Sequence, residues 1–189
     1  KGGGRKARFA ALLRGINVGG KTAVPMAELR LELEKLGLSG VKTLLNSGNA
    51  VFESDLEEAV LESRIDNALE ARFGFHIPAL VRGGAELREA VDGLPFSSEQ
   101  VEYAQAQAGD AASLYVVFLA APLPKEAAIR MEALKKPGET VVASGRLLYL
   151  LLEHSIRECK LFAGMEKVDP RATTRNWNTL TKLDALLGG

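Results

Sequence analysis

Cysteine is nearly absent from this sequence, because Cys159 is the single one among 189 residues. One cysteine cannot form a disulfide within the chain, and this composition is typical of proteins in a reducing compartment. Histidine is almost as scarce, since the chain has only His76 and His154, which lie far apart in the sequence. These residues are too few and too scattered for a Cys/His zinc cluster, and we expect neither a metal nor another cofactor.

Long apolar runs and an excess of one charge are missing as well. The longest apolar run, residues 147–152, is far shorter than the ~20 residues that cross a membrane, so we expect no membrane partner. Lys plus Arg number 24 and Asp plus Glu number 24, which gives a formal net charge of zero. Nucleic-acid-binding proteins depend on an excess of basic groups to neutralise phosphates, so we expect no nucleic-acid partner.

The opening residues 1–7 contain three consecutive glycines and no apolar core of the kind that a secretory signal peptide has. We predict a disordered tail there. Together with the lone cysteine, this segment favours a cytoplasmic location.

The residues that are present are those of a globular protein, 47% hydrophobic and 25% charged. Short apolar runs in the first half predict strands at residues 8–14, 41–45, 50–54 and 77–82. Apolar residues at helical spacing predict one helix that begins at Pro25 and a second that Asp55 caps, and a short helix follows at residues 85–91. The order β-α-β-β-α-β is typical of a ferredoxin-like α+β sandwich, which we predict, with a linker, for residues 8–112.

The second half repeats part of this pattern after a stretch of small and polar residues, 93–113, that we interpret as the linker. Apolar runs predict strands at residues 114–120, 140–143 and 146–153, with a helix at residues 124–134. Ser155 and Glu158 match a capping box, which predicts another helix, and an apolar stripe that starts at Trp177 predicts a last one. We therefore predict a second, smaller α+β domain of order βαββαα over residues 113–189, a faint repeat without a fourth strand.

Residues 15–22 read GINVGGKT and match the letters of a nucleotide-binding P-loop. In a P-loop the helix begins within the Gly-Lys-Thr segment, and its N–H groups hold phosphate. Pro25 would then lie inside the helix, where it costs ~3 kcal/mol. The two strands that follow are also predicted to form a hairpin instead of joining a parallel sheet. The sequence therefore favours a helix that begins at Pro25 and an open glycine-rich loop before it.

Four stretches carry a resemblance to a known family. They are ALLRGINVGG (11–20), VPMAELR (24–30), NSGNAVFES (46–54) and ATTRNWNTLTKL (172–183). Together they resemble an uncharacterised bacterial group, the domain-of-unknown-function family numbered 1697. The resemblance implies an α+β fold with a ferredoxin-like part and no established activity, so it supplies no catalytic residue.

The predicted topology brings three polar segments to one end of the first sheet. In a β-α-β-β-α-β sandwich, the loop after the first strand, the hairpin NSGN and the segment GFHI before the fourth strand all lie at the same end. The side chains that converge there are predicted to be Arg14, Asn17, Lys21, Asn46, Ser47, Asn49 and His76. Cationic groups, amides and exposed glycine N–H groups favour a site for an anion or a phosphate ester.

Each part of this predicted site has a purely structural alternative. The hairpin NSGN fits ordinary turn chemistry, with Gly48 at positive φ, and His76 fits a structural histidine. A second candidate anion site lies in TTRNWN, where Thr173 or Thr174 would cap the last helix, and Arg175 and Asn178 would share its polar face. Its alternative is a capped amphipathic helix with no ligand.

The function favoured by the sequence is the binding of a small anionic, phosphate-bearing ligand at the loop end of the first domain. Whether the protein is an enzyme stays open at this point. The alternative is a non-catalytic module for protein–protein interaction or homodimerisation, and both a monomer and a homodimer fit the sequence.

Overall fold

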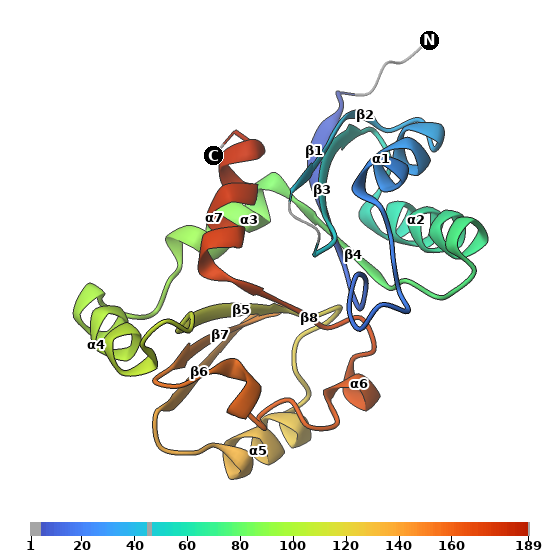
Figure 1. Cartoon of the computed structure of the whole chain (residues 1–189). Coiled ribbons are helices and arrows are strands. Elements are labelled where there is room, and N and C mark those ends of the chain that lie inside the picture. The colour runs from blue at the N-terminus through green and yellow to red at the C-terminus, as the bar shows by residue number, and fades with distance from the viewer. Residues whose placement is uncertain (1–4, 45–46, 189) are drawn as a thin grey trace. The chain divides into compact units, whose positions relative to one another are not determined.

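The computed structural model describes residues 5–44 and 47–188, so most of the predicted tail and Asn46 lie outside the described residues. The chain divides into two compact units (Figure 1). One comprises Lys1–Glu89 together with Thr181–Gly189, and the other comprises Ala90–Leu180.

The N-terminal unit contains a four-stranded antiparallel sheet with the strand order β2-β3-β1-β4. Its elements in chain order are β1 (Ala7–Leu13), α1 (Met26–Lys35), β2 (Ser39–Leu44), β3 (Asn49–Ser54), α2 (Glu58–Phe73), β4 (Ala79–Gly83) and α3 (Gly84–Asp92). Because β3 is antiparallel to both β1 and β2, those two strands run in the same direction with β3 between them.

Helices α1 and α2 cover one face of this sheet (Figure 1). Their apolar stripes, Leu29 and Leu33 on α1 and Leu61, Ile65 and Leu69 on α2, are completely or almost completely buried in the core. The predicted cap of α2 is wrong. The Ser54 hydroxyl accepts the Leu56 N–H in a turn, and the helix begins later, at Glu58.

Carboxylates of α2 accept hydrogen bonds from backbone N–H groups at the edge strand β4 and its start. Asp66 Oδ1 accepts the Ala79 N–H at 2.9 Å, and Glu62 Oε1 accepts the Val81 N–H at 3.0 Å. The two geometries match because four residues of a helix and two residues of a strand both span roughly 6–7 Å. These carboxylates occupy backbone donors that an edge strand otherwise offers to another chain.

The next residue of β4, Arg82, is completely buried. Its guanidinium lies 3.5 Å from Glu58 and 3.6 Å from Glu62 on α2, and 3.4 Å from Glu86 on α3. Two glutamates of α2 and one of α3 therefore surround the buried guanidinium of Arg82.

The C-terminal unit contains a second four-stranded antiparallel sheet, with the order β6-β7-β5-β8. The remaining elements of the chain are α4 (Ser98–Ala108), β5 (Leu114–Phe118), α5 (Lys125–Leu134), β6 (Glu139–Ser144), β7 (Leu147–Leu152), the 3-10 helix η1 (Ile156–Glu158), α6 (Met165–Val168), β8 (Thr173–Asn176) and α7 (Trp177–Leu186). All six residues of β7 are buried, as its lack of polar alternation predicts.

Three predictions for this half are wrong. The predicted linker contains α4, because Ser97 and Gln100 form a capping box before a run of good helix formers. The predicted capping box at Ser155 opens only the 3-10 helix η1. The order βαββαα misses β8, a short strand of polar residues that pairs with β5.

With β8 included, the two sheets share one strand order, and the internal repeat extends to the fourth strand. The register agrees as well: Ala10 of β1 pairs with Arg82 of β4, and Val116 of β5 pairs with Arg175 of β8. Over the described residues the chain is thus a mixed α+β protein with two antiparallel sheets. No helix within the described ranges is long and apolar enough to cross a membrane.

Candidate functional site

The three polar segments predicted to converge do lie at one end of the N-terminal sheet. The Leu13 N–H, at the end of β1, donates to Gly48 O at 2.8 Å, and the Arg14 N–H donates to Pro78 O at 3.0 Å. These bonds join the β1–α1 loop to the β2–β3 turn on one side and to the start of β4 on the other. We call this end of the sheet, formed by residues 14–25, 47–49 and 74–78, the loop end.

The β1–α1 loop is closed by its own hydrogen bonds. Asn17, which has a φ of 54°, donates from Nδ2 to Val24 O at 3.1 Å and accepts the Val24 N–H on Oδ1 at 2.8 Å. The Thr22 hydroxyl likewise bonds both backbone groups of Val18. Helix α1 begins only after Pro25. The loop therefore differs from a P-loop, in which the helix begins within the Gly-Lys-Thr segment.

The predicted amides of the β2–β3 turn serve local structure. Asn49 is completely buried, and its Nδ2 donates to Leu44 O at 3.1 Å and to Ser47 Oγ at 3.0 Å. The side chain of Ser47 is exposed. Asn46 belongs to the residues that the structure leaves undescribed.

Cationic side chains remain accessible at the loop end. Lys21 is exposed, and Arg14 is half-buried. His76 is 59% exposed, and its Nδ1 lies 3.3 Å from the carboxylate of Glu70, a residue near the end of α2 that the sequence reasoning did not include. The loop end thus presents two cationic side chains and one imidazole, with the carboxylate of Glu70 beside the imidazole.

The second predicted candidate, in the C-terminal unit, has a different structure from the one predicted. Arg175 lies on the strand β8 instead of on a helix, and Asn176 caps α7 by accepting the Thr179 N–H at 2.8 Å. The Arg175 guanidinium donates to Thr173 Oγ1 and to Thr174 O. Burial lowers its pKa to about 10. Asn178 is exposed in the first turn of α7.

Cys159 and His154 both approach the buried carboxylate of Glu139. His154 Nε2 lies 3.2 Å from Glu139 Oε1, and its Nδ1 lies 3.0 Å from Ser155 O. Burial, followed by the nearby charge and hydrogen bond of Glu139, raises the pKa of the Cys159 thiol. A nucleophilic cysteine needs a lowered pKa, so this arrangement disfavours thiol catalysis.

We therefore expect Cys159 to react with iodoacetamide more slowly at pH 8 than the same residue does in the urea-unfolded chain. The raised pKa leaves less of the reactive thiolate at that pH. The rate of the native protein should also continue to rise with pH after the rate of the unfolded chain has levelled off. Equal rates at every pH would contradict the assignment of a raised pKa.

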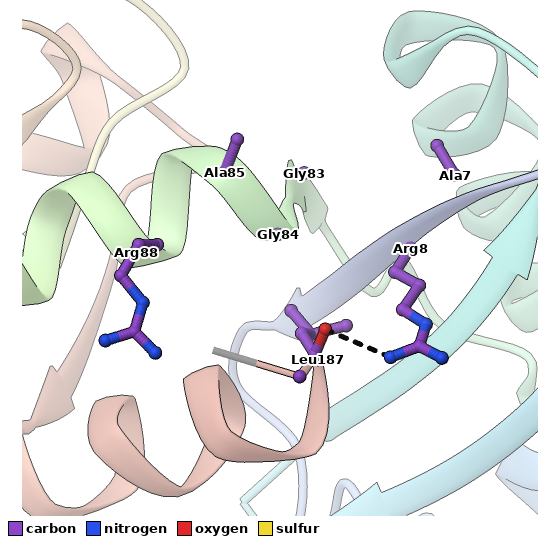
Figure 2. Close-up of a pocket in the computed structure, with 8 residues that line it drawn as sticks. Ala7, Arg8, Gly83, Gly84, Ala85, Arg88 and Leu187 are labelled. Atoms are coloured by element: carbon purple, nitrogen blue, oxygen red, sulfur yellow. Dashed lines mark hydrogen bonds between the residues drawn. The ribbon is translucent and has the colours of Figure 1, made fainter.

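A hollow of about 550 Å³ lies at the opposite end of the N-terminal sheet, where β1 starts and β4 ends (Figure 2). It is lined by Ala7, Arg8, Gly83, Gly84, Ala85, Arg88, Leu187 and Gly188. The side chains of Arg8 and Arg88 extend on either side of Leu187. Arg8 Nη1 donates to Leu187 O at 3.3 Å, and Arg88 Nη2 lies 2.9 Å from Asp184 Oδ2.

The sequence reasoning missed this hollow. The signal available was Gly83-Gly84 between a predicted strand and a predicted helix, followed by Arg88 one turn later. Only the fold adds Arg8 and the end of the chain to these residues. Among the described residues, no group of three or more His, Cys, Asp or Glu side chains is placed to hold a metal ion.

The fold and these sites define a mixed α+β protein in which the loop end gathers cationic groups. The chain belongs to the family described as protein of unknown function (DUF1697), whose model matches residues 7–149. This match confirms the resemblance found in the sequence. The chain is also similar to a solved structure, that of the conserved bacterial protein SP0830 from Streptococcus pneumoniae. The identity is 27% and the TM-score is 0.70, over 97% of this chain and 99% of that one. No curated protein matches the chain.

Proposed function

We propose that the protein binds a small anionic, phosphate-bearing ligand at the loop end of the N-terminal unit. The observation that carries the proposal is the pair of backbone bonds, Leu13 to Gly48 and Arg14 to Pro78, because they bring three polar segments together. A ligand there meets groups from all three segments at once. Neither family description nor structural neighbour names a ligand, so the proposal rests on this geometry.

The predicted residues take two different roles in this proposal. Asn17 and Asn49 shape the loops, since their side-chain amides bond the backbone of Val24 and Leu44. Arg14 and Lys21 supply positive charge, and the imidazole of His76 and the exposed hydroxyl of Ser47 supply hydrogen bonds to phosphate oxygens. Gly15, Gly19 and Gly20, all at positive φ and all exposed, add backbone N–H groups.

The proposal includes a ferredoxin-like arrangement for the N-terminal unit and a cytoplasmic location. The strand order β2-β3-β1-β4, with two helices on one face, supports the first. The single cysteine supports the second.

A thermal-shift screen over phosphorylated metabolites tests the proposal, with Arg14→Ala and Lys21→Ala as variants. A ligand at a hundredfold excess over its Kd is expected to raise the Tm of the wild type by about 5–10 °C. Both variants should lose most of this shift, because each removes a positive charge from the site. Arg30→Ala is the control, since Arg30 is an exposed arginine of α1 that pairs with Glu34.

A shift that survives in Arg14→Ala and Lys21→Ala would contradict the proposed site. If no phosphorylated compound produces a shift, the alternative of an interaction module gains support.

A further inference from the structure

We propose that the hollow between Arg8 and Arg88 is a second anion site, which binds the phosphoryl group of a small organic phosphate. It lies at the end of the N-terminal sheet opposite the loop end, and it does not depend on the function proposed for that end. The volume of about 550 Å³ falls within the ~300–1,000 Å³ typical of pockets for small molecules.

The charges that line the hollow favour an anion. Its two ionisable side chains are both arginines, and the guanidinium group matches the geometry of phosphate with parallel hydrogen bonds. Arg8 and Leu187 also form part of a smaller neighbouring hollow of about 220 Å³, where Lys42 and Glu53 join them. Three cationic side chains and one carboxylate therefore line the two hollows together.

The arginines are held in place and stay accessible. Arg8 Nε lies 3.4 Å from Glu53, and the side chain of Arg8 is 55% exposed. Arg88 pairs with Asp184, whose side chain is only 7% exposed, while that of Arg88 is 40% exposed. These partners limit the freedom of each guanidinium, so less rotamer entropy is lost when an anion binds.

The other lining residues suit the organic part of such a ligand. Ala7, Ala85 and Leu187 give the hollow an apolar wall. Gly83 leaves the backbone just before α3 open to a close approach, because a Cβ there would meet no atom within 4 Å. A phosphate monoester with a small apolar group fits these walls better than inorganic phosphate alone.

The test is an NMR titration of the ¹⁵N-labelled full chain at constant ionic strength, with phenyl phosphate, inorganic phosphate and benzoate as probes. The amides of Gly83, Gly84 and Gly188 should shift and saturate with phenyl phosphate, more weakly with inorganic phosphate, and least with benzoate. Arg8→Gln is expected to weaken phenyl phosphate binding about tenfold, because a hydrogen bond to a charged group is lost. Arg88→Lys, which keeps a cation beside Asp184, should weaken it as well.

The matched control is Arg30→Gln. Arg30 pairs with Glu34 at 3.3 Å with side-chain exposures of 55% and 43%, whereas Arg8 pairs with Glu53 at 3.4 Å with exposures of 55% and 41%. Both variants therefore remove the same charge from equally exposed pairs, and only Arg8 lines the hollow.

Equal weakening by Arg8→Gln and Arg30→Gln would overturn the proposal, and so would shifts that never saturate. Saturable shifts confined to Gly15, Gly19 and Gly20 would overturn it too, while they would support the site at the loop end. Shifts confined to Gly83, Gly84 and Gly188 would support this hollow and count against the loop end.

Discussion

Replacing Arg82 with Met is expected to lower the free energy of unfolding by about 3–5 kcal/mol, as does breaking other buried ion pairs. Arg82 is completely buried, and the carboxylates of Glu58, Glu62 and Glu86 lie 3.4–3.6 Å from its guanidinium. Met fills a similar volume, so the loss reflects three glutamates left together without their cation. Urea unfolding followed by circular dichroism gives the measurement.

Arg72→Met is the matched control for this prediction. Arg72 also pairs with two glutamates of the same unit, Glu28 and Glu32, but its side chain is 45% exposed. Exposed ion pairs contribute about 0–1 kcal/mol, so this variant should unfold close to the wild type. Adding Glu58→Gln and Glu86→Gln to Arg82→Met should recover part of the loss. If both Arg→Met variants lower the free energy of unfolding equally, the buried cluster around Arg82 stabilises the fold no more than the exposed ion pairs of Arg72 do.

Replacing Gly48 with Ala is expected to cost about 2–5 kcal/mol, the sum of backbone strain and overpacking. Gly48 has a φ of 85°, which favours glycine. A Cβ there would lie 2.8 Å from Leu13 Cβ and 2.9 Å from Ile16 Cδ1. The carbonyl of Gly48 also accepts the Leu13 N–H that ties the β2–β3 turn to β1. The variant should therefore weaken ligand binding at the loop end and also lower the free energy of unfolding.

Gly74→Ala separates the two contributions to this effect. Gly74 has a similar φ of 79° at the end of α2, but a Cβ there would meet no atom within 4 Å. Its cost should be the backbone strain alone, about 1–2 kcal/mol. The difference between the two variants, measured by urea unfolding, is the cost of the steric overlap. A zero difference would show that Leu13 and Ile16 move aside freely.

The structure agrees best with the sequence where the pattern reports burial directly. The stripes of α1 and α2 and the runs of β1, β3 and β4 are buried as predicted, because the period of apolar residues follows the geometry of helix and strand. The failures occur where the local pattern is weak. β8 consists of Thr173–Asn176, polar residues that resemble a helix cap, and it is a strand because β5 offers it an edge to pair with.

The candidate site also has one feature that the sequence predicts and others that it does not. The meeting of three loops at one end of the sheet follows from the order of strands and helices, so the sequence predicts it. The roles of the individual side chains do not follow from that order. Asn17 and Asn49 look like ligand-binding amides in the sequence, yet each bonds a backbone group beside it in space. Arg8 looks like an ordinary charge at the start of a strand, yet it lines a hollow with Arg88 and Leu187.

By itself, the sequence determined the mixed α+β class, most helices and strands, and the end of the sheet at which the polar loops meet. Only the tertiary structure decided which polar side chains stay available to a ligand and where a hollow forms. The physical reason is that periodicity records burial along one segment, whereas a hydrogen-bond partner or a cavity wall depends on residues that the fold brings in from elsewhere.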